Sequence, residues 1–266
     1  MGHYRIAAVR MGRTVSIVAA LSVGLWVGTA GAQTPFGGDD TGFLLPKTNP
    51  GAKCEAGAAK AAGKLQQCIK KCSASRASGK LADDTAEDSC EKTLAGKSCT
   101  AKFALSISKL KGCPACINGT SMATLSNLVE ALIDGNNNTI YCDSSSGTPF
   151  GGDDTGFVPP AKTATAKCEA GAAKAEAKLE ACIGKCHASR FAGKLADDTA
   201  EDACEKTLAG KSCAAKFTAS IAKLSGCPTC INGTTMASLA ALTETLIDAN
   251  NSAVYCATSP SGAFLQ

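Results

Sequence analysis

The residues with the greatest capacity for chemistry in this chain are its sixteen cysteines. A thiolate can exchange with disulfides or bind a soft metal, whereas paired cysteines form structural bridges. The cysteines fall into two sets of eight with identical spacing, at Cys54, Cys68, Cys72, Cys90, Cys99, Cys113, Cys116 and Cys142, and at Cys168, Cys182, Cys186, Cys204, Cys213, Cys227, Cys230 and Cys256. Because each set is even, every cysteine can pair within its own set. The sequence therefore predicts a structural disulfide framework.

One pair in each set has the spacing C-P-x-C, beginning at Cys113 and at Cys227. This motif resembles that of thiol–disulfide oxidoreductases, where a strand delivers the first cysteine to a helix N-terminus and the pKa of its thiol falls. Here the preceding residues have a helical pattern, and no βαβ unit is visible. We favour a turn that joins two helices, and we keep a redox protein as an alternative.

Another pair in each set has the spacing C-x-x-x-C, beginning at Cys68 and at Cys182. Residues four apart lie on one face of a helix. The spacing resembles that of bacterial copper-storage four-helix bundles, and the resemblance implies a Cu(I) carrier, since soft thiolates favour Cu(I). There is one such pair per set and only four Met in the whole chain. A metal or small-ligand carrier is therefore an alternative to the disulfide framework.

The sequence contains only two histidines, which limits the sites that depend on this residue. His3 lies in the N-terminal segment, so His187 is the one histidine in the rest of the chain. Attachment of c-type haem needs the motif C-x-x-C-H. Three residues instead of two separate Cys182 from Cys186, which His187 follows, so the motif is not formed there. A Ser–His–Asp arrangement is impossible within the first cysteine set. We predict no catalytic residue, no cofactor and no histidine-bound zinc, and we expect His187 to face solvent.

Acidic residues gather at one predicted helix start in each cysteine set, at Asp83, Asp84, Glu87 and Asp88, and at Asp197, Asp198, Glu201 and Asp202. Two carboxylates can perform acid–base catalysis. Capping and the helix dipole also place acidic residues at this position. We favour the structural interpretation.

The decapeptide TPFGGDDTGF occurs at 34–43 and again at 148–157. Its carboxylates are weak candidates for Ca²⁺, which takes six to eight oxygen ligands. We interpret it as a header before each cysteine set, which Phe36 and Phe43 can anchor on a helix. The weak metal candidates are Asp39, Asp40, Asp153 and Asp154.

Four formal glycosylation triplets are interpreted as loop markers. They begin at Asn118, Asn137, Asn232 and Asn250.

The elements that position these residues are predicted to be helices, because Ala, Lys, Leu and Gln are abundant and alternating β-branched runs are scarce. We expect no sheet. A helical hairpin that turns near residue 81 puts Cys72 and Cys90 at equal distances from the turn, which predicts the bridges Cys72–Cys90 and Cys186–Cys204. The other pairings stay open. The predicted helices of the first set are Ala52 to about Ser75, Asp84 to about Leu94, a stretch marked by Phe103, Ile107 and Leu110, and one that Thr120 or Ser121 caps.

The chain is a tandem duplication, since each cysteine recurs 114 positions later (182 − 68 = 114). Residues 1–32 have the basic start, short apolar run and small-residue ending of a signal peptide. The predicted organisation is a signal peptide at 1–32, repeat 1 at 33–147, repeat 2 at 148–258 and a tail at 259–266. The predicted fold class is all-α, with two tandem disulfide-stapled helical bundles of three to four helices each after the cleaved signal peptide.

Composition limits the function. The predicted signal peptide removes three of the 27 basic residues, which leaves 24 against 23 acidic ones. This balance gives no case for nucleic acid or an anionic membrane as partner. We expect a secreted or periplasmic, non-enzymatic binding or structural module without a membrane anchor, whose partner is an unknown extracellular or periplasmic protein or ligand. The alternatives are a small-ligand or Cu(I) carrier and a thiol–disulfide redox protein.

Overall fold

The computed structural model describes residues 42–44, 49–145, 147, 150, 156, 162–257 and 263–265. All of them belong to one compact unit, Ala32–Gln266. The predicted signal peptide and the aspartates Asp39, Asp40, Asp153 and Asp154 lie outside the described residues. Each repeat folds as a long helix, a short helix that continues as a π-helical segment, a medium helix and a second long helix. The elements are α1 (Pro50–Ala77), α2 (Asp84–Asp88), η1 (Ser89–Thr93), α3 (Cys99–Ser108), α4 (Gly119–Ile140), α5 (Ala164–Phe191), α6 (Asp198–Asp202), η2 (Ala203–Thr207), α7 (Cys213–Ile221) and α8 (Gly233–Asn251).

The prediction of an all-helical, disulfide-stapled chain is confirmed, with one small exception. Two three-residue strands, β1 (Gly42–Leu44) and β2 (Ala263–Leu265), pair antiparallel with Phe43 opposite Phe264. The expectation of no sheet was therefore wrong at this one place. The pairing joins a header segment to the C-terminal tail through backbone hydrogen bonds, which sequence periodicity over three residues does not reveal.

Side-chain caps set the helix starts. Asn49 accepts a hydrogen bond from the Gly51 amide, with Pro50 in the first turn. Asp83 accepts one from the Ala86 amide, so the cap is Asp83 and not Asp84. Asn118 forms a capping box with Ser121 and begins α4 earlier than predicted.

Two of the four glycosylation triplets begin within helices, so they were wrongly interpreted as loop markers. Asn137 is in α4 and is buried, and Asn250 is in α8. Asn118 and Asn232 cap helix starts, which agrees with the turn chemistry of Asn-Gly-Thr.

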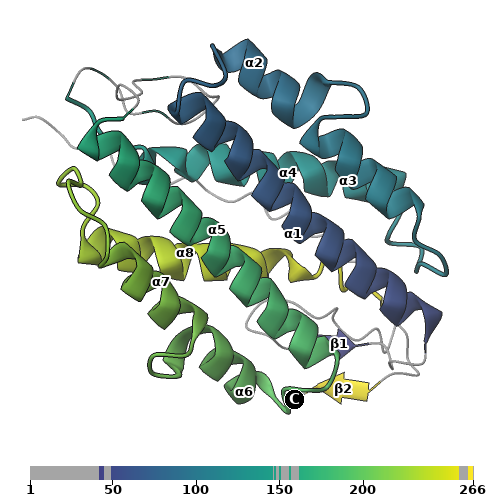
Figure 1. The fold of residues 1–266 in the computed structure, drawn as a ribbon. Coiled ribbons are helices and arrows are strands. Elements are labelled where there is room, and N and C mark those ends of the chain that lie inside the picture. Colours follow the sequence, from purple (N-terminus) through teal and green to yellow (C-terminus); the bar gives the residue numbers. More distant parts are fainter. Residues whose placement is uncertain are drawn as a thin grey trace, which may run out of the picture. The chain divides into compact units, whose positions relative to one another are not determined.

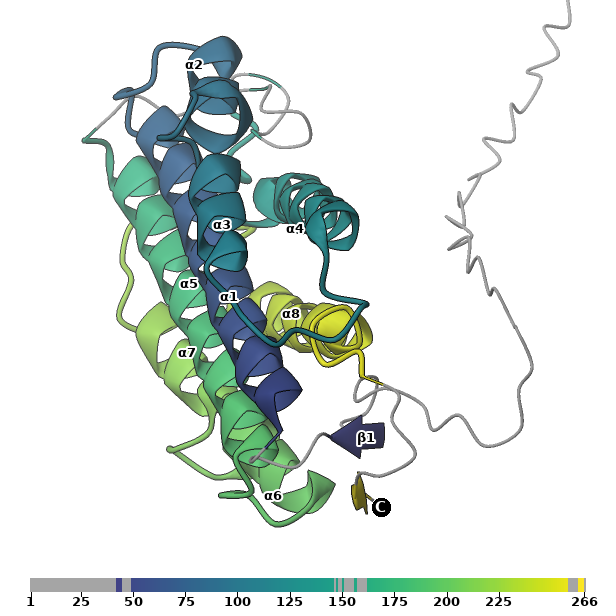
Figure 2. The same cartoon turned by 90° about the vertical axis from the view of Figure 1, so that its right-hand side faces the viewer.

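The two longest helices, α1 and α5, lie side by side and run antiparallel (Figure 1). The helices α3 and α7 flank this pair. The second long helices of both repeats, α4 and α8, pack on one side of it (Figure 2). The repeats thus meet along α1 and α5, which places α4 and α8 over a shared floor.

Each hydrophobic core contains residues from both repeats. Val254 and Tyr255 at the end of repeat 2 lie in the core built around α1, α3 and α4. Ile140 and Tyr141 at the end of repeat 1 lie in the core built around α5, α7 and α8. The two repeats therefore exchange their C-terminal ends.

One residue of the second header segment, Phe150, lies in this exchanged region. Phe150 is completely buried, and its ring meets Tyr141 edge-on with the ring centroids 5.4 Å apart. Phe150 occupies the position of Phe36 in the duplicated decapeptide. The prediction that a header phenylalanine anchors on the helices is thus confirmed for the second copy.

Candidate functional site

All sixteen cysteines are paired in eight disulfides. The predicted bridges Cys72–Cys90 and Cys186–Cys204 are both present. Four further bridges also lie within a repeat: Cys54–Cys113, Cys68–Cys99, Cys168–Cys227 and Cys182–Cys213. The last two, Cys116–Cys256 and Cys142–Cys230, cross between repeats. The expectation that each repeat pairs internally was therefore wrong for these four cysteines, because their partners lie on the exchanged chain ends.

The C-P-x-C cysteines do not pair with each other. Cys113 is bound to Cys54 on α1, and Cys116 is bound to Cys256. The oxidised form of a C-P-x-C redox site contains a bond between its own two cysteines. In this fold the motif is instead a branch point, from which one bridge stays within the repeat and the other crosses to its neighbour. This arrangement favours a structural role for the motif.

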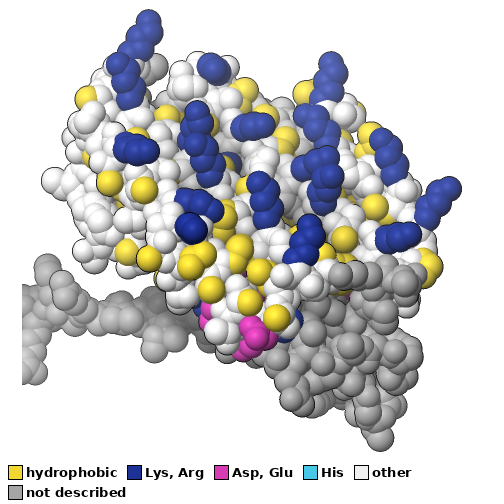
Figure 3. Space-filling view, turned by 60° about the horizontal axis from the view of Figure 1, so that its bottom comes forward, with side chains coloured by type: hydrophobic (Ala, Val, Ile, Leu, Met, Phe, Trp, Pro, Cys, Tyr) yellow, Lys and Arg dark blue, Asp and Glu magenta, His cyan; other side chains and the backbone are white. Residues whose placement is uncertain are grey.

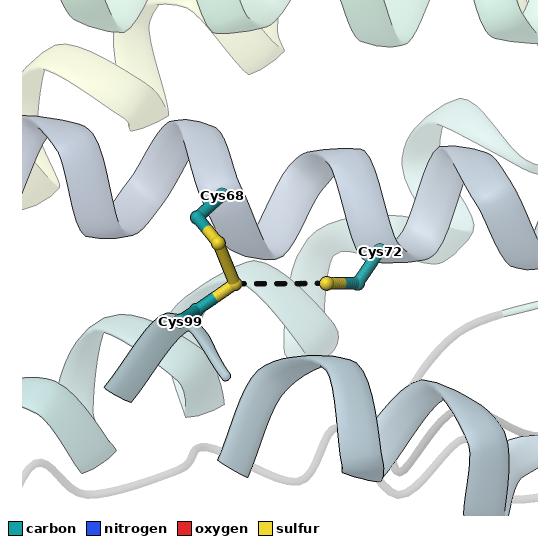
Figure 4. Close-up of side chains that lie close together, drawn as sticks. All are labelled: Cys68, Cys72 and Cys99. Carbon is teal, nitrogen blue, oxygen red and sulfur yellow. Dashed lines mark hydrogen bonds between the residues drawn. A yellow bond between two sulfur atoms is a disulfide. The ribbon is translucent and has the colours of Figure 1, made fainter. Parts of the chain in front are cut away.

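The C-x-x-x-C cysteines converge with a third cysteine, as Figure 4 shows for the first repeat. The Sγ of Cys72 lies 3.6 Å from the Sγ of Cys99, which is bonded to Cys68. Because Cys72 is bonded to Cys90, no sulfur of this cluster carries a hydrogen or the charge that a Cu(I) ligand needs. The same contact recurs between Cys186 and Cys213. Both clusters are pairs of adjacent disulfides in this structure.

His187 is buried, with 2% of its surface exposed, so its predicted solvent-facing position was wrong. Its Nε2 lies 3.0 Å from Glu205 Oε1 in η2 and 3.0 Å from Asp248 Oδ1 in α8. The helix pattern could not reveal this environment, since both partners come from distant elements.

The acidic run at each short helix has two separate roles. Asp83 and Asp197 cap the helix, which confirms capping as the role of the first acidic residues but moves the cap one residue earlier than Asp84. Glu87 and Glu201, four residues later, have no exposed surface. A buried acidic centre forms in each repeat, with Glu91, Glu130 and Asp134 in one and Glu205, Glu244 and Asp248 in the other. A capping argument does not predict these centres, because it concerns only the first turn of the helix.

Most lysines of the described residues are at least partly exposed, whereas many acidic residues are buried. Figure 3 shows one face of the unit over which Lys and Arg side chains are spread, with acidic side chains confined to a small area. Exposed lysines recur along one side of α1 at Lys53, Lys60, Lys64 and Lys71. This face is therefore more basic than the near-neutral composition of residues 33–266.

A cavity of about 560 Å³ lies where the two repeats meet, lined by residues of α1, α4, α5 and α8. Its lining is mainly apolar and comes from equivalent positions of both repeats, notably Leu128 and Leu132 in α4 with Leu242 and Leu246 in α8. Leu128 and Leu242 are 37% and 41% exposed, which places apolar surface at the opening of the cavity. The size and lining match those of a small-molecule site.

A buried ion-pair cluster forms one part of the polar lining of the cavity. Lys70 of α1 contacts Glu176 and Glu180 of α5, with 2.9 Å between Lys70 Nζ and Glu180 Oε1. Burial alone would lower the pKa of Lys70, but the charges of Glu180 and Glu176 outweigh it and raise this pKa. Burial raises the pKa of Glu180 to about 7 against the opposing charge of Lys70. The second oxygen of Glu180, Oε2, has no hydrogen-bond partner among the described residues.

This cluster breaks the symmetry of the duplication. The position of Lys70 is occupied in repeat 2 by Gly184, and the positions of Glu176 and Glu180 are occupied in repeat 1 by Ala62 and Gln66. The two repeats have therefore diverged into complementary partners that are no longer interchangeable.

Comparisons with known proteins identify no relative. No protein-family model matches this chain, and neither a curated protein nor a solved structure is significantly similar to it. Among the described helices, none is long and apolar enough to cross a membrane.

Proposed function

We propose that the protein is a secreted, non-enzymatic binding module that holds a small, mainly apolar ligand in the cavity between its two repeats. The observation that carries this proposal is the cavity, which is large enough for a ligand and lined by leucines from both repeats. A chain held by eight disulfides suits an oxidising compartment, in agreement with the signal-peptide pattern of residues 1–32.

The polar side chains of the cavity suggest which functional group the ligand contains. Glu180 Oε2 is an acceptor in a side chain that is 9% exposed, and buried acceptors are costly when they lack a donor. A ligand with an apolar body and one hydroxyl or amino group satisfies both parts of the lining. The ligand class that we propose is therefore a small amphiphile with a hydrogen-bond donor at one end.

The duplicated architecture supports a pre-formed site. The floor of the cavity is the α1–α5 pair, and the exchanged chain ends are fixed by Cys116–Cys256 and Cys142–Cys230. Walls that are fixed before binding reduce the ordering cost of holding a ligand.

Binding of a fluorescent amphiphile to the oxidised mature protein tests the proposal. The decisive variant is Gly63→Leu, since Gly63 lines the cavity and a Cβ built on it meets nothing within 4 Å. The new side chain extends into open space and occupies the site without a clash at its first atom. Loss of probe binding at preserved stability is the expected result, and unchanged binding contradicts the proposal.

A further inference from the structure

Several polar atoms surround the Nε2 atom of His187. Glu205 Oε1 and Asp248 Oδ1 each lie 3.0 Å from Nε2, and Glu201 Oε1 lies 3.9 Å away. Asn251 Nδ2 is also 3.3 Å from the same nitrogen. A neutral or charged imidazole offers at most one hydrogen at Nε2. A single hydrogen at Nε2 can point directly at one of these oxygens and reaches both only as a bifurcated bond.

A shared metal ion accounts for the whole arrangement. First-row divalent ions bind imidazole nitrogen and carboxylate oxygen at about 2.1 Å, so neighbouring ligands lie about 3.0 Å apart around a six-coordinate ion and about 3.4 Å apart around a four-coordinate Zn²⁺. The separations of 3.0 Å between Nε2 and each of the two oxygens are close to both values. The three donors come from α5, η2 and α8, and none of their side chains is more than 8% exposed.

The charges at this centre support the same conclusion. Four carboxylates gather here, with Arg190 3.6 Å from Glu201 and Lys206 2.6 Å from Glu244. A divalent ion adds two positive charges at the point where these carboxylates converge. Buried charges are stable when they are paired or coordinate a metal. The carboxylates of the centre are Glu201, Glu205, Glu244 and Asp248.

The first repeat contains the same centre without its histidine. Ser73 stands at the position of His187, and its Oγ accepts a hydrogen bond from Asn137 Nδ2 at 3.4 Å. Glu91, Glu130 and Asp134 still converge there. An all-oxygen donor set suits Mg²⁺, Ca²⁺ or Mn²⁺, whereas an added imidazole favours later transition ions. The two repeats therefore differ in the one ligand that sets metal preference.

We propose that His187, Glu205 and Asp248 bind one divalent transition-metal ion, with Zn²⁺ as the representative probe, and that Glu201 and Glu244 complete its surroundings. His187 also lines the cavity between the repeats, which gives the ion a route to the buried centre. The inference is independent of the proposed ligand, because the metal donors and the leucines are different residues.

Calorimetric titration of the chelator-treated, oxidised protein with Zn²⁺ tests this inference. One equivalent is expected to bind, and His187→Ser, which copies Ser73 of the first repeat, is expected to weaken its binding by at least about 10-fold, as losses around metal ligands do. Asp248→Asn is a second ligand variant with the same expectation. Glu91→Gln, the change in repeat 1 at the position of Glu205, is the matched control and leaves the high-affinity equivalent unchanged. Unfolding temperatures measured without metal show whether each variant folds.

A spectroscopic readout separates a ligand from a merely structural residue. Pulsed electron paramagnetic resonance of the protein loaded with Cu²⁺ detects coupling to a histidine nitrogen, which His187→Ser must abolish. Absence of saturable Zn²⁺ binding in the wild type would overturn the inference. Equal binding by His187→Ser and Asp248→Asn, or persistence of the nitrogen coupling in His187→Ser, would overturn it as well.

Discussion

A disulfide joins Cys116 of the first repeat to Cys256 of the second, with their Cα atoms 6.1 Å apart across 140 positions of sequence. Its counterpart joins Cys142 to Cys230. The chain end of each repeat is therefore fixed to the body of the other, and the duplicated units form one interlocked structure. The cavity between α4 and α8 depends on this relationship, because each wall belongs to a different repeat.

The crossing bridges predict how a cut chain behaves. A specific protease site inserted after Gly147, between the repeats, allows cleavage into two halves. The halves are expected to stay together on a denaturing gel without reductant and to separate with it. Replacing Cys116, Cys142, Cys230 and Cys256 by Ser should release the halves without reductant.

The matched control removes a bridge within one repeat. In the double variant Cys72→Ser and Cys90→Ser, the cut halves stay linked, because this bridge does not cross between the repeats. Halves that separate without reductant in the wild-type background would show that the crossing bridges do not form.

The disulfides that the sequence could predict are those whose two cysteines are placed by local helix structure. The Cys72–Cys90 bridge follows from helix length and turn position, which are local. Cys116 and its partner could not be assigned in that way, since the duplication offers two equivalent candidates, Cys142 and Cys256. Only the packing of whole repeats selects between them.

The same limit explains the missed sites. The face of α5 on which His187 lies could be read as exposed, because its partners Glu205 and Asp248 lie 18 or more positions away. Glu87 was assigned to helix capping together with Asp84, whereas Asp83 makes the capping bond and Glu87 is buried. The cavity arises from the placement of α4 and α8 on the α1–α5 pair, which no local pattern encodes.

Loss of Lys70 is expected to destabilise the fold strongly. Lys70→Met leaves Glu176 and Glu180 buried without their shared cation, and removal of one member of a buried ion pair costs roughly 3–5 kcal/mol. The free energy of unfolding in denaturant measures this loss. Lys71→Met, a neighbouring and exposed lysine, is the control and should change stability by less than about 0.5 kcal/mol.

A compensated variant tests the cause of that loss. Combining Lys70→Met with Glu176→Leu and Glu180→Leu removes the whole cluster, and apolar replacement of a buried ion pair is often neutral. Stability should return toward that of the wild type. If Lys70→Met alone matches Lys71→Met, the buried cluster does not hold α1 against α5.

Two buried glutamates should make stability depend on pH. Burial raises the pKa of Glu55 from 4.5 to about 7, against the opposing hydrogen bond from the Ala257 amide. Glu169 has the same raised pKa of about 7, with the Asp143 amide as donor. Between pH 4.5 and 7 the folded state holds protons that the unfolded state has released, so the contribution of these groups to stability falls as pH rises.

Glutamine variants isolate this contribution. Glu55→Gln with Glu169→Gln keeps an acceptor for each amide and removes the titration. The wild type should lose more stability than this double variant between pH 5 and pH 8, as measured by denaturant unfolding at both pH values. Parallel losses in the two proteins would show that other groups set the pH dependence.

The most direct test of the ligand-binding account is the affinity of Gly63→Leu for a fluorescent amphiphile, compared with that of Gly135→Leu. Both changes are on helices at positions with open space, and both replace Gly with a better helix former, worth about 1 kcal/mol. Only Gly63 lines the cavity. We predict saturable probe binding at one site in the wild type and in Gly135→Leu, and at least about 10-fold weaker binding in Gly63→Leu, equivalent to 1.4 kcal/mol. Equal affinity in all three proteins would contradict the assignment of the cavity as the binding site.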